Sequence, residues 1–459
     1  MGQMKTLLHQ KLWSTKALCW ASVLVILMII NNLRDWEDYK QVIYWDTLSY
    51  YAYLPAAFIH GDLSLKFTSK APAAYSQKFW PNTTPEGYKV IKTTMGLAYL
   101  YAPFFFIAHG AAHVLGYQTD GFSDPYSLMM LLGVVFYFAI GLFALRKILL
   151  RYFSPFVTGL TLIAVVFATN LFHYTFEQST VAHTYNFMLF NIFIGLSILW
   201  HERPNWKTSL FLGFVFGLIV LIRPTNILIG LFFLLFGITS VARLKEQFRK
   251  FGRHWQLLLL MAAASQFPWI PQYLYWKLFA GQWIFWSYTG ERFFFNDPEV
   301  LNVLFSYRKG WLLYTPIMAF ALVGIFFLRQ QLKPFFLPIL IFTILNFYVI
   351  SSWWCWWWGG CYGQRAFVDS YGLMAFPLAA LMAWSLKKHF ATRVATLVLV
   401  TLLTAHGIFQ TAQYHYGAIH YDAMTKEAYL HQFLRLRQGP LFWKYVKTPD
   451  YKAARKNEE

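Results

Sequence analysis

The stretch GLAYLYAPFFFIAHGAAHVLG, residues 96–116, decides the topology of this chain. It is long enough to cross a membrane, but it contains Pro103, His109 and His113. The chain around it is 58% hydrophobic and only 13% charged, whereas soluble domains are about 25% charged. Because the sequence has no long polar stretch that would form a soluble domain, it predicts one polytopic, all-α membrane protein.

Apolar runs of membrane-spanning length recur along the chain. The first, at residues 18–30, follows a basic start and has no small-residue cleavage site after it, so we interpret it as an uncleaved transmembrane helix. Ten further runs lie at about 126–145, 156–173, 181–200, 208–222, 225–242, 256–279, 311–329, 334–351, 368–386 and 394–410. If residues 96–116 do not cross, about eleven transmembrane helices are expected, within a range of 10–13.

Charge indicates whether residues 96–116 cross, because cytoplasmic loops carry an excess of Lys and Arg. Without a crossing there, one side holds the N-terminus and the connections near 146–155, 201–207, 243–254, 329–333 and 387–393. These segments contain eighteen Lys and Arg residues against two acids, Glu202 and Glu246. A crossing would move every later loop to the other side. We therefore expect residues 96–116 to lie on or dip into the outer leaflet.

The outer segments are long and aromatic and contain most of the acidic residues. The expected organisation is a membrane domain at 1–410, whose outer loop at 33–125 contains interfacial helices, followed by an amphipathic tail at 411–459. The formal net charge of +19 comes mostly from the basic connections and the tail. No nucleic-acid-binding motif accompanies this charge, so no nucleic-acid partner is expected.

The segment YWDTLSYYAYLPAAFIHGDLSLKF, residues 44–67, places a carboxylate among aromatic rings just after the first apolar run. Asp46 lies beside Tyr50 and Tyr51. A carboxylate near the apolar boundary is costly to keep charged without partners, and it is suited to act as a general base. The alternative is that Asp46 caps a surface helix. Asp62, in HGDL, is a second candidate or a turn residue.

Further motifs follow in order: ATNLFHYTFEQSTVAHTYNF, LIRPTN, SYRKGWLLYTPIMAF and WWGGCYGQRAFVDSYGLMAFP. Together with the first loop and residues 96–116, this order over 18–410 resembles the GT-C superfamily of integral membrane glycosyltransferases of the bacterial type. The usual acidic pair of that family is not plain in the first loop, since Thr47 follows Asp46. It stays open whether Asp46 acts alone or with another acid.

The resemblance implies an inverting hexosyl- or pentosyltransferase in a bacterial inner membrane. A polyprenyl-phosphate sugar would be the donor, a glycan, lipid or protein the acceptor, and membrane lipids the surroundings. The active site would face the periplasm or exterior. Asp46 would be the catalytic base, with Tyr50 and Tyr51 beside the substrate.

Transfer from a phosphate-linked sugar needs fixed cations near the leaving phosphate, and the fork of an arginine binds two phosphate oxygens at once. The outer-side candidates are Arg365, Arg308, Lys309, Arg223 and Arg292. For Arg365 the alternatives are anchoring at the headgroups or pairing with Asp369, four residues later. A tight turn explains Arg223 equally well.

Other residues are weaker candidates for lining the cavity. Glu177 and His183 share a short outer segment, and Glu291 is expected either to pair with Arg292 or to touch the ligand. The run WWCWWW, residues 353–358, predicts an interfacial aromatic belt or a stacking wall. A disulfide between Cys355 and Cys361, in the same segment, is geometrically possible.

Cofactors and rival functions stay open at this point. No metal-ligating residue is predicted, although a divalent cation could bind Asp46 and a phosphate. One alternative function is a transporter or flippase of lipid-linked sugars, which would need polar residues inside its spans. Another is a non-catalytic assembly subunit, in which Asp46 would be dispensable.

Overall fold

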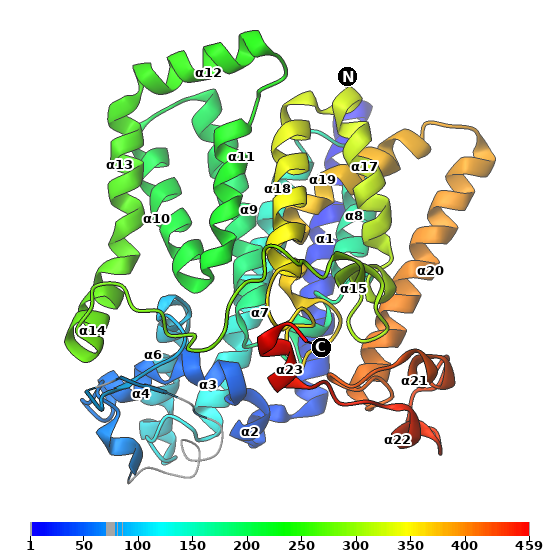
Figure 1. Ribbon diagram of the computed structural model, residues 1–459. Helices are drawn as coiled ribbons and strands as arrows, with labels where there is room; N and C mark the ends of the chain where they lie inside the picture. Colours follow the sequence, from blue (N-terminus) through cyan, green and yellow to red (C-terminus); the bar gives the residue numbers. More distant parts are fainter. Residues whose placement is uncertain (1, 70–78, 80, 85, 459) are drawn as a thin grey trace.

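The computed structural model describes residues 2–69, 79, 81–84 and 86–458. The gaps fall at the first residue, in the predicted outer loop and at the last residue of the predicted tail, so those positions lie outside the described residues. Long helices pack lengthwise into a bundle, and short helices and loops gather at one end of it (Figure 1). The strands of the described chain are only β1 (Asn82–Thr83) and β2 (Lys89–Val90), so the all-α prediction is confirmed.

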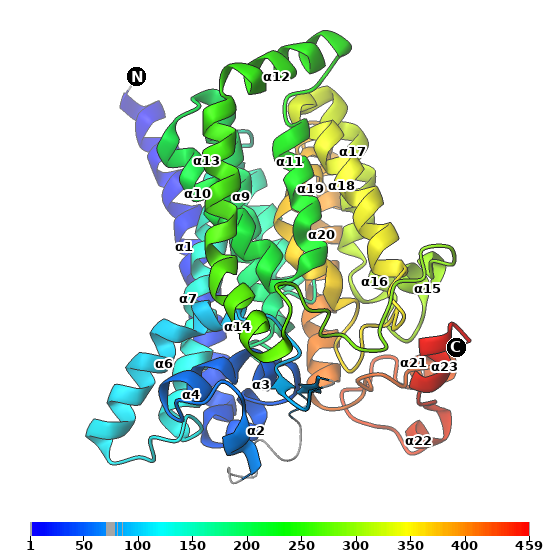
Figure 2. The same cartoon turned by 60° about the vertical axis from the view of Figure 1, so that its left-hand side comes forward.

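The helical segments that run along the bundle in the described chain can be followed in Figures 1 and 2. They are α1 (Gly2–Leu33), α7 (Asp124–Leu149), α8 (Pro155–Phe167), α9 (Ala182–Glu202), α10 (Trp206–Ile222), α11 (Gly230–Leu235) with the preceding 3₁₀ turn η4 (Pro224–Ile229), α13 (Trp255–Gln266) with η5 (Phe267–Trp269) and α14 (Ile270–Ala280), α17 (Ile317–Gln331), α18 (Lys333–Ser351), α19 (Tyr371–Ser385) and α20 (Phe390–His415). Their order and number agree with the predicted spans, and the protein is a multi-pass membrane protein.

Helix α6 (Gly96–Leu115) is the exception among the long apolar helices. By length and composition it is one of seven described helices that could cross a membrane. Figure 2 shows it running obliquely beside α3 (Trp45–Tyr51) and α4 (Tyr53–Phe58), at one end of the molecule. It lies outside the lengthwise bundle, as predicted for residues 96–116.

The connections at one end of the bundle carry the basic residues. We call this the basic end; it comprises the N-terminus and residues 150–154, 203–205, 236–254, 332 and 386–389 (Figure 1). Helices leaving it begin with polar caps: the side chains of Ser154 and Asn205 accept hydrogen bonds from the amides of Val157 (3.3 Å) and Thr208 (3.0 Å). Such caps satisfy amides that the helix leaves without partners.

The opposite end, which we call the loop end, comprises residues 34–69, 79, 81–84, 86–123, 168–181, 281–316, 352–370 and 416–458 (Figures 1 and 2). Besides α3, α4 and α6, its short elements are η1 (Asp35–Glu37), α2 (Tyr39–Val42), η2 (Lys66–Ser69), η3 (His173–Thr175), α15 (Val300–Phe305), α16 (Trp311–Tyr314), η6 (Arg365–Ser370), α21 (Lys426–His431), α22 (Phe442–Tyr445) and α23 (Tyr451–Lys456). The predicted tail therefore packs at the same end as the predicted outer loop.

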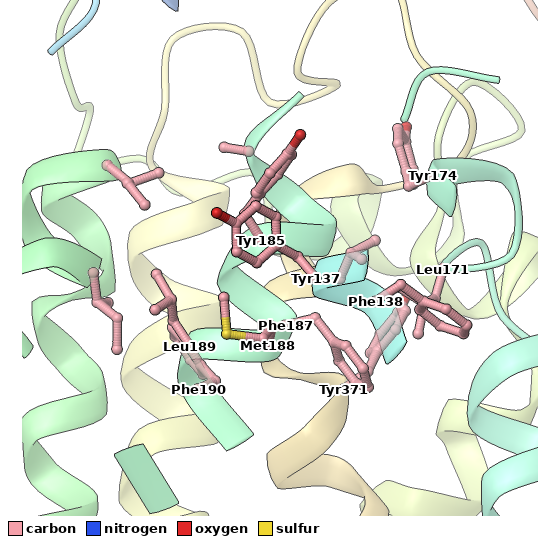
Figure 3. Close-up of a cluster of buried hydrophobic side chains, with 14 of the residues drawn as sticks. Tyr137, Phe138, Leu171, Tyr174, Tyr185, Phe187, Met188, Leu189, Phe190 and Tyr371 are labelled. Carbon is pink, nitrogen blue, oxygen red and sulfur yellow. The ribbon is translucent and has the colours of Figure 1, made fainter. Parts of the chain in front are cut away.

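An aromatic core lies where α7, α9 and α19 meet, next to the loop end (Figure 3). It includes Tyr137 and Phe138 from α7, Tyr185 and Phe187 from α9, and Tyr371 from α19. Each of these side chains is buried. Rings of this size fix the positions of the three helices, because a packed core has little free volume.

Gly372 brings α9 and α19 unusually close together. A Cβ atom at this position would collide with Oδ1 of Asn191 on α9. Only glycine leaves room for this approach, which is typical of helix contacts in membrane proteins. The contact holds η6, which directly precedes α19, against the first turns of α9.

Candidate functional site

The structure brings Asp46 and Arg365 together although they are far apart in the sequence. Asp46 is the second residue of α3, and Arg365 is the first residue of η6. Nη2 of Arg365 lies 3.0 Å from Oδ2 of Asp46. The Asp46 side chain is 54% exposed and that of Arg365 only 18% exposed. The pair therefore joins a carboxylate that solvent reaches to a largely buried guanidinium.

Two of the alternatives that the sequence left open, helix capping by Asp46 and pairing of Arg365 with Asp369, are wrong. Helix α3 begins at Trp45 with Tyr44 as its cap residue, so Asp46 lies inside the first turn and does not cap the helix. Arg365 contacts Asp46, while the carboxylate of Asp369 is bound by residues from other helices. A 3₁₀ helix advances three residues per turn, so positions four apart in η6 do not share a face.

Asp369 is a site residue that the sequence analysis did not select. Its carboxylate is buried and receives polar groups from three different segments. On α9, Nδ1 of His183 lies 2.7 Å from Oδ1, and Nδ2 of Asn186 donates to Oδ2 at 3.0 Å. Nη1 of Arg223 and Nδ2 of Asn226 donate to the same Oδ2 at 3.1 and 2.8 Å. An acid inside an apolar run was the available signal, because ionisable residues there are costly and mark functional sites.

Arg223 contacts both the buried carboxylate of Asp369 and the ring of Trp358. It ends α10 and begins η4, so the tight turn expected from LIRPTN is present. Its side chain is 11% exposed, and its guanidinium lies 4.9 Å from the centre of the Trp358 ring. Cation–π contact and the carboxylate together fix the orientation of this guanidinium.

Tyr50 and Tyr51 point to different places. Tyr50 is buried beside the charged groups: burial and then the charge of Asp46 raise its pKa to about 12, against the opposing charges of Arg223 and Arg365. Tyr50 is therefore a neutral hydroxyl next to the Asp46–Arg365 pair. The Tyr51 hydroxyl donates to the carbonyl of Gly121 at 2.6 Å, which directs this ring into the core of the loop end.

Glu177 and His183 are only six residues apart in the sequence, but they belong to different clusters of polar side chains. His183 binds Asp369, whereas Oε2 of Glu177 lies 3.4 Å from Nδ1 of both His173 and His415. Burial would raise the pKa of Glu177, but its contacts with the two imidazoles outweigh burial and lower the pKa to about 2. Glu177 is thus a carboxylate at neutral pH, held away from Asp369.

The expected ion pair between Glu291 and Arg292 is not formed. Glu291 pairs instead with Lys92 from the first loop, and it accepts a hydrogen bond from Nε1 of Trp354 at 3.1 Å. The guanidinium of Arg292 lies 4.8 Å from the ring centre of Phe294 and is exposed. Lys92, which the sequence analysis missed, joins the first loop to residues 280–310.

Arg308 and Lys309 lie in different environments. The ammonium of Lys309 is buried and donates to the carbonyls of Cys361 and Tyr421. Lys309 therefore connects the segment around Cys361, just before Arg365, with the tail around Tyr421 through hydrogen bonds. The guanidinium of Arg308 lies 5.0 Å from the ring centre of Trp357.

Asp62 holds a turn of the first loop. Its carboxylate accepts hydrogen bonds from the amides of Ser64 (2.9 Å) and Phe67 (3.1 Å). These bonds outweigh slight burial and lower the pKa of Asp62. All of its recorded partners are local, so the turn interpretation fits this residue.

The tryptophan run packs inside the protein. Trp354, Trp356 and Trp357 are 8%, 7% and 0% exposed. Tyr451 of α23 contacts the Trp357 ring with a centroid distance of 5.4 Å. The expected interfacial belt is therefore wrong for these three rings, because all three are buried and Tyr451 of the tail contacts both Trp354 and Trp357. The nearby Cys355 and Cys361 are buried free thiols, so the possible disulfide is not formed.

The groups around Asp46 do not suit a divalent cation. Mg²⁺ and Ca²⁺ need several oxygen ligands, while Asp46 is paired with a guanidinium. Within the described ranges, no group of three or more His, Cys, Asp and Glu side chains is placed to hold a metal ion. The donor set present here thus suits an anion beside Arg365 better than a resident metal.

Solved structures similar to this chain include archaeal oligosaccharyltransferases from Archaeoglobus fulgidus. AglB, in complex with an inhibitory peptide and a dolichol-phosphate, is 12% identical with a TM-score of 0.47, over 95% of this chain and 62% of that chain. An apo form of the A. fulgidus oligosaccharyltransferase is 13% identical with a TM-score of 0.45, over 94% of this chain and 61% of that chain. The chain thus spans less than two thirds of their length. Neither a protein-family model nor a curated protein matches it.

Proposed function

We propose that the protein is an inverting membrane glycosyltransferase that transfers a sugar from a polyprenyl-phosphate donor to a glycan, lipid or protein acceptor. The observation that carries this proposal is the contact between Asp46 and Arg365 at the loop end. It combines a base that solvent and an acceptor can reach with a cation held largely out of water. Arg223 and the neutral hydroxyl of Tyr50 lie beside the pair.

The reaction assigns one task to each group. Asp46 takes the proton of the acceptor hydroxyl as its oxygen bonds to the anomeric carbon. The bond from that carbon to the phosphate oxygen breaks, and polyprenyl phosphate leaves with the electron pair. Arg365 stabilises the charge that grows on the phosphate, because its five N–H groups allow it to bind the phosphate as well as Asp46. Attack opposite the leaving phosphate inverts the anomeric configuration.

The first test replaces Arg365 by Lys. An ammonium is a point charge and cannot reproduce the two-pronged contact of a guanidinium with a phosphate. Hydrogen bonds to charged groups are worth enough that losing one should raise the donor KM roughly 10- to 100-fold. Steady-state transfer kinetics with a purified polyprenyl-phosphate sugar measure this change.

Arg292→Lys is the matched control, because Arg292 is an exposed arginine of the same end that contacts Phe294. It should leave the donor KM unchanged. If Arg365→Lys also had normal kinetics, Arg365 would be an anchor at the headgroups, and the phosphate role would pass to Arg223 or Arg308.

Orientation follows from the charge asymmetry. We expect the basic end to face the cytoplasm and the loop end to face the periplasm or exterior of a bacterial cell. In intact cells, an impermeant maleimide should label Gln118→Cys but leave Ala242→Cys unlabelled, since both positions are exposed and lie at opposite ends. The native cysteines are buried and give little background. The reverse labelling pattern would place the candidate site in the cytoplasm.

A further inference from the structure

Helix α12 (Val241–Arg253) differs from every helix of the bundle. It lies across the basic end, between α11 and α13, instead of running along the bundle (Figures 1 and 2). None of its residues is buried. It carries five cations and one acid: Arg243, Lys245, Arg249, Lys250, Arg253 and Glu246.

One stripe of α12 is apolar. One face of the helix carries Val241, Leu244, Phe248 and Phe251, which recur at helical spacing. Lys245 lies beside this face, and Arg243, Arg249, Lys250 and Arg253 lie away from it. Lys250 donates to the carbonyl of His201 in the bundle. Phe251 is docked on the bundle, with its ring 5.6 Å from that of Phe233. The other three are 71%, 37% and 67% exposed in chain order. Because all four share a face, the three exposed side chains point to the same side of α12 as Phe251, which is the side that faces the bundle.

The residues around α12 are of the kind found where a protein meets the lipid headgroups. Trp206 and Trp255, which begin α10 and α13 at the same end, are 58% and 55% exposed. Tryptophan is enriched where a protein crosses the membrane–water boundary. In such a layer an apolar stripe would meet the acyl chains and a cationic face the lipid phosphates.

From this arrangement we propose that α12 is a binding surface for anionic phospholipids in the leaflet at the basic end. An amphipathic helix with a cationic polar face binds at the interface through buried apolar area and attraction to anionic lipid. The positive charge of α12 is opposite to that of an anionic lipid headgroup. Within its apolar stripe, Phe251 packs against the core of the bundle, while Val241, Leu244 and Phe248 are exposed. This surface is independent of the proposed glycosyl transfer.

The test measures hydrogen–deuterium exchange of the α12 amides in the full-length protein. The protein is placed in nanodiscs of phosphatidylcholine alone or mixed with phosphatidylglycerol. Exchange should be slower with phosphatidylglycerol, and high salt should remove the difference. The triple variant Lys245→Gln/Arg249→Gln/Arg253→Gln should also remove it, because each cation near an anionic surface changes binding about fivefold.

Lys387→Gln/Lys388→Gln/Arg393→Gln is the matched control, since it removes the same charge from the α19–α20 connection and the first turn of α20, at the same end. It should keep the difference between the two lipids. Phe248→Ser should speed exchange in both lipids, because it removes the largest exposed ring of the stripe. Equal exchange of the unmodified protein in both lipids would overturn the proposal, as would loss of the difference in the control.

Discussion

Replacing Asp46 by Asn is expected to lower the rate of sugar transfer roughly 10²- to 10⁴-fold, the usual loss when a general base is removed. Asn keeps the shape of the side chain but cannot take the proton of the acceptor. The Asp46 side chain is 54% exposed but that of Arg365 only 18% exposed, so the variant also leaves a largely buried guanidinium without its counter-charge. The cost to stability should therefore lie between that of an exposed pair, about 0–1 kcal/mol, and that of a buried pair, about 3–5 kcal/mol, and the variant should still insert but unfold at a moderately lower temperature than the parent. Transfer assays and thermal unfolding of the purified protein measure the two effects.

Asp38→Asn is the matched control in the same loop. The Asp38 side chain caps α2 by accepting from the amide of Lys40 at 3.0 Å, and Asn caps a helix about as well. This variant should keep full activity. Near-normal transfer by Asp46→Asn would eliminate Asp46 as the base and direct attention to Glu177 or Asp62. It would also favour the transporter and assembly-subunit alternatives.

The arrangement of the helix bundle could be predicted from the sequence because its causes are local. Each span is a continuous apolar run, and the basic connections distinguish the two ends of the bundle. Residues 96–116 have the length of a span but lie as α6 beside α3 and α4, as the charge count required (Figure 2).

The site could be predicted only in part, because its contacts join distant positions. Asp46 and Arg365 were selected separately, one for its aromatic setting and the other for its place before a span. That they touch depends on the packing of η6 against α9, which no local pattern encodes. Asp369 was missed for the same reason: its partners come from α9, α10 and η4.

The tryptophan run shows a different limit. Its composition predicts either an interfacial belt or a stacking wall, whereas the tail, far away in the sequence, packs on part of the run. Tyr451 covers Trp357 across almost one hundred residues of sequence. A pattern within one segment cannot reveal a cover that is supplied by another segment.

The second large effect is expected from Asp369→Asn. Asp369 is buried, and the variant leaves the guanidinium of Arg223 without its counter-charge at a position that is only 11% exposed. Breaking a buried ion pair by removing one partner costs about 3–5 kcal/mol. His183, Asn186 and Asn226 would also face a neutral amide in place of a carboxylate. We therefore expect a clear fall in the midpoint of thermal unfolding.

The double variant Arg223→Gln/Asp369→Asn separates this electrostatic cost from simple loss of packing. If the unpaired charge of Arg223 causes the instability, removing that charge should recover part of the unfolding midpoint, because the two residues are coupled. The double variant should transfer sugar more slowly than the unmodified protein even if its unfolding midpoint recovers, since the guanidinium beside Trp358 and Tyr50 is then missing. A double variant less stable than Asp369→Asn alone would show that the Arg223–Asp369 ion pair is not what holds this part of the site together.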